Sequence, residues 1–434
     1  MSEKKSLRIA LLHPDLGIGG AERLMVDLAL ACQNNNNQVD IYTSHHDDHS
    51  FEETKDGTLN VYVHGDFIPR HFFHHFFIFF STLRALYLSL VVSLNSSSYD
   101  LILCDTNAAY MPLLRLLTNS KIFFYCHMPD QYLCIRTSLL KKIYRIPFDL
   151  FEEFCMCFAD KVCVNSLFTR DKYKKCFSHI QIVPDASVLY PCVNIKEDSS
   201  IKQPNEYIQS LLSDSRGYFV SLNRYERKKC VERCIYALKI YRDKVGIDLF
   251  NQQNIHLVIM GGYDTRVKEN VDYYCELEQL AKSFDLSSNV SLLKSPSEET
   301  RNQLIYHSLS LIYTPTDEHF GIVPLESMIL YTPVIAHASG GPKETVIDGY
   351  NGFLFNDEND IADDMIQIVN SNKLRNQLGQ HGRKRVLEKF SFESFSTQVN
   401  TILHSIPSKD NRYLLRLLFI LSIILFSILI YFLF

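Results

Sequence analysis

The sequence predicts an α/β protein of two Rossmann-like domains that face each other across a cleft. Short apolar runs alternate with helical patterns, which is typical of a parallel, doubly wound sheet. The alternation occurs twice, and a polar stretch at residues 194–214 separates the two copies. A chain of 434 residues is also too long for one ordinary core and fits two domains of roughly 200 residues each.

The N-terminal domain, about 1–205, begins with a strand at Leu7–His13, a glycine turn and a helix through Ala21–Cys32. Further buried strands are expected at Val39–Thr43, Leu101–Cys104, Ile122–Cys126, Lys161–Asn165 and Gln181–Val183. The C-terminal domain, about 212–395, starts with a strand at Tyr218–Leu222. Its other strands are expected at His256–Met260, Val290–Leu293, Leu309–Tyr313, Val334–Ala336 and Gly352–Phe355.

Residues 396–412 are expected to form a return helix and linker that lead to a transmembrane anchor at 413–434. Leu417–Phe434 carries no charge and spans about 27 Å as a helix, close to the roughly 30 Å of a bilayer core. A buried core helix is the alternative. Lys409, Arg412 and Arg416 precede the run, and the positive-inside tendency then keeps the preceding domains in the cytosol.

A second apolar segment, residues 72–94, is rich in phenylalanine and is expected to interact with the membrane. We expect it to lie in the interface, with Phe76 and Phe77 inserted. A full span and a buried core helix remain alternatives. Lys141 and Lys142 stand beside apolar residues and either contact lipid phosphates or form an ordinary solvated face.

Composition excludes several other classes of partner. A formal net charge of −5 gives no field that would hold a nucleic acid. The twelve cysteines show no CxxC pair, so reduced thiols are expected. The segment His45–His49 contains metal-ligand side chains, but its place in a polar loop favours a solvated turn. We therefore expect no metal and no cofactor.

The sharpest motif is Glu318-His319-Phe320-Gly321-Ile322-Val323-Pro324-Leu325-Glu326, which follows an apolar strand and opens a helix. Gly321 allows close backbone approach, and the N–H groups of a helix start can meet hydroxyls or phosphates. Two glutamates eight residues apart do not suit glycoside hydrolysis, which needs facing carboxylates. They better suit two hydroxyl-bearing parts of one extended ligand. The alternative is a pair of surface glutamates at a helix end.

Other candidate residues follow strands of the two domains. Arg224 and Lys229 come just after the strand at 218–222, where fixed cations can stabilise a departing diphosphate. Gly19 and Gly20 precede a helix whose amides can touch phosphates. His127 ends the strand at 122–126, with Asp130 nearby. Solvated faces, a tight turn and a structural histidine are the respective alternatives.

These motifs are similar to those of the retaining glycosyltransferases of family 4, which have the GT-B fold, and the resemblance covers nearly the whole chain. The E-x7-E signature corresponds to Glu318 and Glu326. Segments that resemble the family's ligand loops are GGAER at 19–23, NRYERKK at 223–229 and SGGPKE at 339–344. The resemblance implies that Glu318 holds the donor sugar and Glu326 the ribose. It also implies that amides near Phe320, Gly321, Ile322 and Val323 orient the sugar and that His127 contacts it. Apart from the resemblance, we expect Lys294 to line the base pocket.

More narrowly, GGAERLMVDLAL, FYCHMPDQYL, NRYERKK and HFGIVPLESM resemble the mannosyltransferases that extend dolichol-linked oligosaccharides. This implies GDP-mannose as donor and a dolichyl-diphosphate-linked oligosaccharide as acceptor, extended first by an α-1,3 and then by an α-1,6 mannose. It implies work at the cytosolic face of the endoplasmic reticulum membrane, with other transferases of the pathway as candidate partners. The alternatives are a family-4 transferase with another acceptor and a non-catalytic scaffold.

Overall fold

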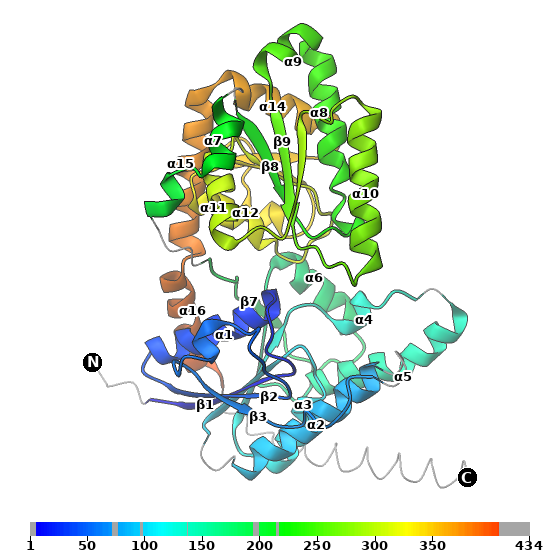
Figure 1. The fold of residues 1–434 in the computed structure, drawn as a ribbon. Coiled ribbons are helices and arrows are strands. Elements are labelled where there is room, and N and C mark those ends of the chain that lie inside the picture. The colour runs from blue at the N-terminus through cyan, green and yellow to red at the C-terminus, as the bar shows by residue number, and fades with distance from the viewer. Residues whose placement is uncertain are drawn as a thin grey trace. The chain divides into compact units, whose positions relative to one another are not determined.

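The computed structural model describes residues 6–71, 77–95, 99–136, 138–193, 199–213 and 217–407. The predicted anchor at 413–434 and Phe76 lie outside these ranges. The chain divides into two compact units, one of residues 1–192 with 392–434 and the other of residues 193–391. Figure 1 shows the elements of each unit.

The first unit contains a parallel sheet in the order β3-β2-β1-β4-β5-β6-β7. Its strands are β1 (Arg8–His13), β2 (Gln38–Thr43), β3 (Asn60–Val63), β4 (Leu101–Asp105), β5 (Lys121–Cys126), β6 (Lys161–Val164) and β7 (Ala186–Val188). Its helices are α1 (Gly20–Asn34), α2 (Phe77–Leu94), α3 (Tyr110–Leu117), α4 (Asp130–Leu133), α5 (Leu139–Met156), α6 (Leu167–Cys176) and α16 (Phe392–Ser405).

Both faces of this sheet are buried because successive strand residues point to opposite sides. Ile9 and Leu11 belong to a core shared with α1 and α16. Ala10 and Leu12 belong to a second core shared with α2, α3 and α5. Since apolar cores cover both faces of the sheet, polar functional residues are expected at the carboxyl ends of its strands.

The second unit contains a parallel sheet in the order β10-β9-β8-β11-β12-β13. Its strands are β8 (Tyr218–Leu222), β9 (His256–Gly261), β10 (Val290–Lys294), β11 (Leu311–Tyr313), β12 (Val334–His337) and β13 (Gly352–Phe355). Its α-helices are α7 (Glu206–Ser213), α8 (Glu232–Val245), α9 (Ile247–Gln253), α10 (Lys268–Ser283), α11 (Glu298–His307), α12 (Ile322–Ile329), α13 (Pro342–Thr345), α14 (Glu358–Asn370) and α15 (Asn372–Lys389). Two parallel sheets confirm the predicted pair of Rossmann-like domains.

The predicted domain boundaries at 205, 212 and 395 are displaced. Residues 199–213, expected as a polar linker, form a 3-10 turn (Ser199–Lys202) and α7, both packed against α11. Ile201, Ile208 and Leu211 are buried there, so this segment belongs to the second unit. The return helix α16 packs on α1 and belongs to the first unit.

The strand predicted at Gln181–Val183 is also wrong. These residues form a turn in which the Val183 N–H donates to the Ile180 carbonyl at 3.2 Å, and β7 begins only at Ala186. The Tyr173 hydroxyl donates to the carbonyl of Pro184 at 2.9 Å and fixes that turn.

Helix α2 is the one described helix that is long and apolar enough to cross a membrane. One face packs in the core through Ala85, Leu88 and Val92, and Arg84 is buried with its Nε donating to the Ile68 carbonyl at 2.7 Å. The other face exposes a set of apolar side chains: Phe77, Phe79, Leu83, Leu90 and Leu94. The helix is thus partly a core helix and partly an apolar surface.

Candidate functional site

The loop between β11 and α12 holds the first predicted glutamate in a rigid setting. Gly321 is the N-terminal cap of α12, with a φ of 77°. A side chain at this position would meet Tyr313, whose Cε1 lies 3.2 Å from the position of an added Cβ. The ring of Phe320 is buried and packs on Phe390, with 6.0 Å between ring centroids. The N–H groups of residues 321–323 therefore form a helix start, where such groups have no partner inside the helix.

A second glycine loop, Ser339-Gly340-Gly341, packs against the backbone of Asp317 and Glu318 and holds it in place. The Gly341 N–H donates to the Glu318 carbonyl at 2.8 Å, and the Ser339 hydroxyl accepts from the Asp317 N–H at 2.8 Å. Gly340 has a φ of 63°, and a Cβ there would lie 2.3 Å from the Glu318 carbonyl oxygen. Only glycine allows this approach, so the resemblance of residues 339–344 to a ligand loop has a structural reason.

Replacing Gly340 by Ala is expected to lower the sugar-transfer activity that the resemblance implies on the order of 100-fold, because the new methyl group displaces the backbone of Glu318. The matched control is Gly349→Ala. Gly349 also has a positive φ, 70°, but nothing lies within 4 Å of an added Cβ. This control should lose about 1 kcal/mol of stability and keep its activity. Equal rates for the two variants in a radiolabelled sugar-transfer assay would contradict the supporting role of the loop.

Lys229 and Glu318 lie in direct contact. The Lys229 Nζ is 2.5 Å from Glu318 Oε2, and the two side chains are 14% and 23% exposed. The Thr314 hydroxyl donates to the Lys229 carbonyl at 2.7 Å, which ties the end of β8's loop to the end of β11. The structure thus brings together a cation predicted for the diphosphate and a carboxylate predicted for the sugar. Such a pair fits the junction between sugar and phosphate in a nucleotide-sugar.

Arg224 follows β8 and is largely exposed, with a side chain 64% accessible and its Nη1 3.0 Å from Glu226 Oε1. The backbone of this loop packs directly against the backbone of Gly261, which fixes the position of the loop. The Asn223 carbonyl oxygen lies only 1.7 Å from where a Cβ of Gly261 would stand. The guanidinium is therefore available for a diphosphate ligand, and it does not contact Glu318 in the contacts described.

Glu326 lies on α12 and Lys294 at the end of β10. Burial raises the pKa of Glu326, and the positive charge of Arg301 opposes this shift. Burial raises the pKa of Tyr313, and the charges of both Glu318 and Glu326 add to the shift, so the two motif glutamates flank one tyrosine. The Lys294 ammonium lies 4.0 Å from the ring centroid of Tyr274 and 4.5 Å from that of Tyr263. Its predicted place in a base pocket stays a prediction.

In the first unit, His127 belongs to a cluster at the carboxyl edge of the sheet. Its Nε2 lies 2.8 Å from Asp105 Oδ2, and His13 Nδ1 lies 2.8 Å from Asp105 Oδ1. Burial alone would raise the pKa of Asp105, but the two histidines outweigh it and lower that pKa to about 2. Burial opposes the charged form of His13, yet the Asp105 carboxylate raises its pKa. Because Asp105 is ionised, both facing ring nitrogens donate to it, and His127 keeps Nδ1 for a ligand.

Gly19 and Gly20 lie at the start of α1. Gly19 is the N-terminal cap with extended backbone, and the Glu22 carboxylate folds back to within 2.3 Å of where its Cβ would stand. Gly20 has no atom within 4 Å of an added Cβ, so its surroundings are open. The helix start is open at Gly20, and its predicted contact with phosphates stays a prediction.

The predicted acceptor and membrane residues lie on α2, α4 and α5. Asp130 Oδ2 accepts from Arg145 Nη2 at 2.7 Å. Lys141 and Lys142 are exposed on α5, and Phe77 is 53% exposed at the start of α2. In the structure Asp130 thus forms an ion pair with the buried side chain of Arg145, and its predicted contact with the acceptor stays a prediction.

Sequence reasoning missed Asp105, His13 and Gly261 as site residues. Asp105 and His13 each end an apolar strand, which is the signal that singled out His127. Applying that signal to every strand would have found both. Gly261 carries no such signal, since its role depends on which loop packs against it.

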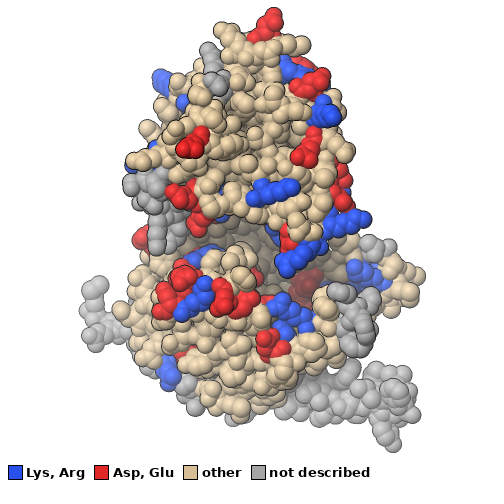
Figure 2. All heavy atoms as spheres, in the orientation of Figure 1, with Lys and Arg blue, Asp and Glu red and all other residues tan. Residues whose placement is uncertain are grey.

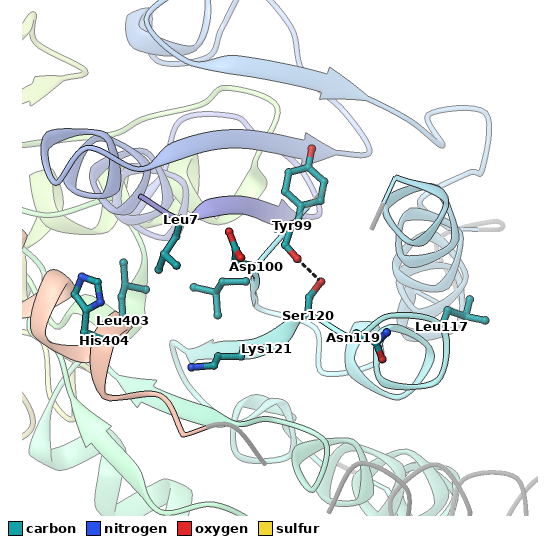
Figure 3. Close-up of a pocket in the computed structure, with 10 residues that line it drawn as sticks. Leu7, Tyr99, Asp100, Leu117, Asn119, Ser120, Lys121, Leu403 and His404 are labelled. Carbon is teal, nitrogen blue, oxygen red and sulfur yellow. Dashed lines mark hydrogen bonds between the residues drawn. The ribbon is translucent and has the colours of Figure 1, made fainter. Parts of the chain in front are cut away.

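A cavity of about 550 Å³ lies at the opposite, amino edge of the first sheet (Figure 3). Leu7, Tyr99, Lys121 and His404 are among its lining residues. Within the described ranges, no group of three or more His, Cys, Asp or Glu side chains is arranged as metal ligands. On the face that Figure 2 shows, the described acidic and basic side chains are interspersed.

Comparisons with known proteins agree with this geometry. The model of glycosyl transferases group 1 matches residues 203–385, and that of glycosyltransferase family 4 matches residues 18–197. The α-1,3/1,6-mannosyltransferase ALG2 of Dictyostelium discoideum is 44% identical over 93% of the chain and 99% of its own length. The chain belongs to the ALG2 family of α-1,3/1,6-mannosyltransferases. The mouse member is 38% identical over 90% of the chain and 94% of its length.

Solved structures show the fold of this ALG2-family chain. Anabaena HepE in complex with UDP and glucose has a TM-score of 0.69 at 19% identity, over 92% of this chain and all of that one. Sucrose-phosphate synthase of Thermosynechococcus elongatus has a TM-score of 0.67 at 20% identity, over 92% and 98%. The predicted GT-B fold and the predicted glycosyltransferase class are both confirmed.

Proposed function

We propose that this ALG2-family chain transfers mannose from GDP-mannose to monomannosyl chitobiosyl diphosphodolichol in α-1,3 linkage, and then to that product in α-1,6 linkage. The observation that carries the proposal is the contact between Lys229 and Glu318, 2.5 Å apart, at the start of the E-x7-E segment of this ALG2-family chain. One group suits the phosphate and the other the sugar of a nucleotide-sugar donor.

Arg224 and Lys229 supply positive charge to the diphosphate as the bond to the sugar breaks. Preorganised cations stabilise the developing charge of a leaving group without a metal ion. Glu318 accepts hydrogen bonds from mannose hydroxyls, and Glu326 from the ribose. The N–H groups at residues 321–323 orient the sugar. The acceptor hydroxyl attacks from the face that the diphosphate leaves, and the leaving phosphate takes its proton, so the anomeric configuration is retained.

His127 contacts the sugar that is transferred. Its Nε2–H donates to Asp105, so its Nδ1 is the atom presented to a sugar hydroxyl. Asp105 positions both histidines, because His13 Nδ1 donates to both of its carboxylate oxygens and His127 Nε2 donates to Oδ2. His13 is buried and is a positioning residue as well.

The exposed face of α5 supports a membrane location. Its Leu139, Leu140 and Ile143 are 73%, 81% and 57% exposed and stand beside Lys141 and Lys142. Together with the exposed face of α2, these apolar and basic residues suit the surface of an anionic bilayer. We place the protein at the cytosolic side of the endoplasmic reticulum membrane, where a dolichol-linked acceptor is presented.

The test is purified full-length protein with GDP-mannose and a synthetic lipid-diphosphate mannosyl chitobiose, with and without EDTA. We expect two successive mannose additions at rates that EDTA does not change. Loss of transfer with EDTA would contradict the proposed role of Arg224 and Lys229 as sole counter-charges. A folded protein that elongates only another acceptor, or none, would contradict the proposed substrate or the enzyme activity itself.

A further inference from the structure

A cavity of about 400 Å³ lies in the first unit between α2, α4 and α5. It opens beside the strand ends that carry the His127 cluster, since Thr106 and Asn107 follow β4 and Asp130 follows β5. Thr106 has a φ of 59°, a strained conformation for a β-branched residue that is concentrated at functional sites. Neither the predicted donor residues nor the exposed membrane face of α5 accounts for this cavity.

The wall of the cavity combines apolar surface with carboxylates. Phe77, Phe148 and Leu133 provide the apolar part, while Asp130 and Glu152 provide the carboxylates. The side chain of Arg145, only 7% exposed, is already bonded to Asp130 and to Asp149, at 2.7 and 2.8 Å. Its charge is therefore neutralised twice within the protein.

This combination excludes two parts of the proposed acceptor. A diphosphate would meet the carboxylate of Asp130 and a single cation, Arg145, that is already paired with two carboxylates of the protein, so repulsion dominates. An isoprenoid chain would remove the Asp130 side chain, which is 49% exposed, from water without offering it a hydrogen-bond donor, which costs free energy. A neutral ligand with both hydrogen-bond donors and apolar groups fits the wall.

Glu152 is suited to such a ligand. Its two oxygens accept the N–H groups of Asp130 and Gln131 at 2.8 and 3.0 Å, which holds the carboxyl in place. Burial raises the pKa of Glu152 to about 7, so its neutral form is well populated near neutral pH. A carboxyl in that state can accept from, or donate to, amide and hydroxyl groups.

We propose that this cavity binds an N-acetylhexosamine residue of the acceptor oligosaccharide. The acetamido N–H and sugar hydroxyls meet Glu152, Asp130 and the polar groups of Asn107, while the acetyl methyl and sugar face pack on Phe148 and Leu133. The cavity volume lies within the usual range of roughly 300 to 1,000 Å³ for small-ligand sites. The inference rests on the proposed acceptor and adds the site that selects its reducing-end sugars.

Cys134 lines the cavity, and Cys275 is exposed on α10 in the other unit. The alkylation rate of each cysteine in the full-length protein is measured by peptide mass spectrometry. A lipid-diphosphate mannosyl chitobiose should slow alkylation of Cys134 at least about fivefold and leave Cys275 unchanged. The same lipid diphosphate without sugar should protect neither cysteine. An analogue with 2-hydroxyl groups in place of the acetamido groups should protect Cys134 less.

Protection by the sugar-free lipid diphosphate, equal protection by the 2-hydroxyl analogue, or no protection at all would each overturn the inference. In kinetics, Cys134→Leu fills the cavity and should raise the acceptor KM about tenfold with the donor KM unchanged. Cys275→Leu is the matched control and should change neither. If the acceptor protects Cys134 of the wild-type protein but is never elongated, the proposed function is contradicted and this inference is not. If the acceptor is elongated but does not protect Cys134, this inference is contradicted and the proposed function is not.

Discussion

Glu318→Gln and Lys229→Ala are each expected to lower kcat for mannosyl transfer on the order of 100-fold while the protein stays folded. Each change removes one member of the pair whose atoms lie 2.5 Å apart. Gln keeps the size of Glu318 but loses its charge, so the donor sugar and Lys229 are both held less firmly. Loss of Lys229 removes positive charge from the leaving diphosphate.

The measurement is single-turnover transfer from radiolabelled donor, with circular dichroism to check folding. Lys239→Ala and Glu388→Gln are the controls, because Lys239 pairs with Asp243 on α8 and Glu388 is 60% exposed on α15. The double variant of Lys229 and Glu318 should lose less than the product of the two single losses, since both groups act on one ligand. Wild-type rates in both single variants would refute the assignment.

Asp105→Asn is expected to have the second-largest effect, a loss of kcat on the order of 100-fold with a loss of stability of about 3 kcal/mol. The carboxylate holds two histidines and is fully buried with His13. An amide can accept from only one ring, so His127 loses its orientation and His13 its counter-charge. The stability loss is measured by thermal unfolding in detergent, and kcat by sugar transfer.

His127→Ala separates the two effects, because its side chain is 20% exposed and its loss leaves the His13–Asp105 pair intact. It should lower kcat and leave the unfolding temperature within a few degrees of the wild type. Asp171→Asn, on the surface of α6, is the control. An Asp105→Asn protein with lowered stability and unchanged kcat would reduce the cluster to a structural role.

The pH dependence of stability follows from the pKa of Asp105, which is lowered to about 2 from a usual 3.8. A carboxylate with a lowered pKa in the folded state stabilises that state above its unfolded pKa and loses this contribution as the pH falls through the folded value. The wild type and Asp105→Asn should therefore differ most above pH 4. Their difference should shrink as the pH falls from 4 toward 2.

The sequence predicted the two sheets and the local structure of the E-x7-E segment well, because both depend on local pattern. The segment from Glu318 to Glu326 follows an apolar strand, and its own residues include the glycine and the helix start, so all three features can be recognised from the sequence. The contact of Glu318 with Lys229 spans 89 positions and depends on β8 lying beside β11, an order that apolar runs do not encode. The same holds for Asp105, which meets His13 only because β4 lies beside β1.

The misplaced boundary has a related cause. Residues 199–213 look polar because most of the described side chains in this segment are exposed or half-buried, while Ile201, Ile208 and Leu211 are buried. Three buried residues in a short segment are too few for a periodic signal, yet they suffice to fix the segment to one unit. The cavity beside α5 was hidden for a different reason, since its lining comes from three separate helices and one loop.

The position of α16 has a consequence for how the chain matures during synthesis. Phe395, Val399 and Leu403 complete the core on one side of the first sheet, yet the ribosome makes them only after the whole second unit. The first unit to be translated is thus the last whose core can close, and until then α1 presents apolar residues that attract chaperones or neighbouring chains. A premature stop directly after Ser391 would release a finished second unit attached to an unfinished first one.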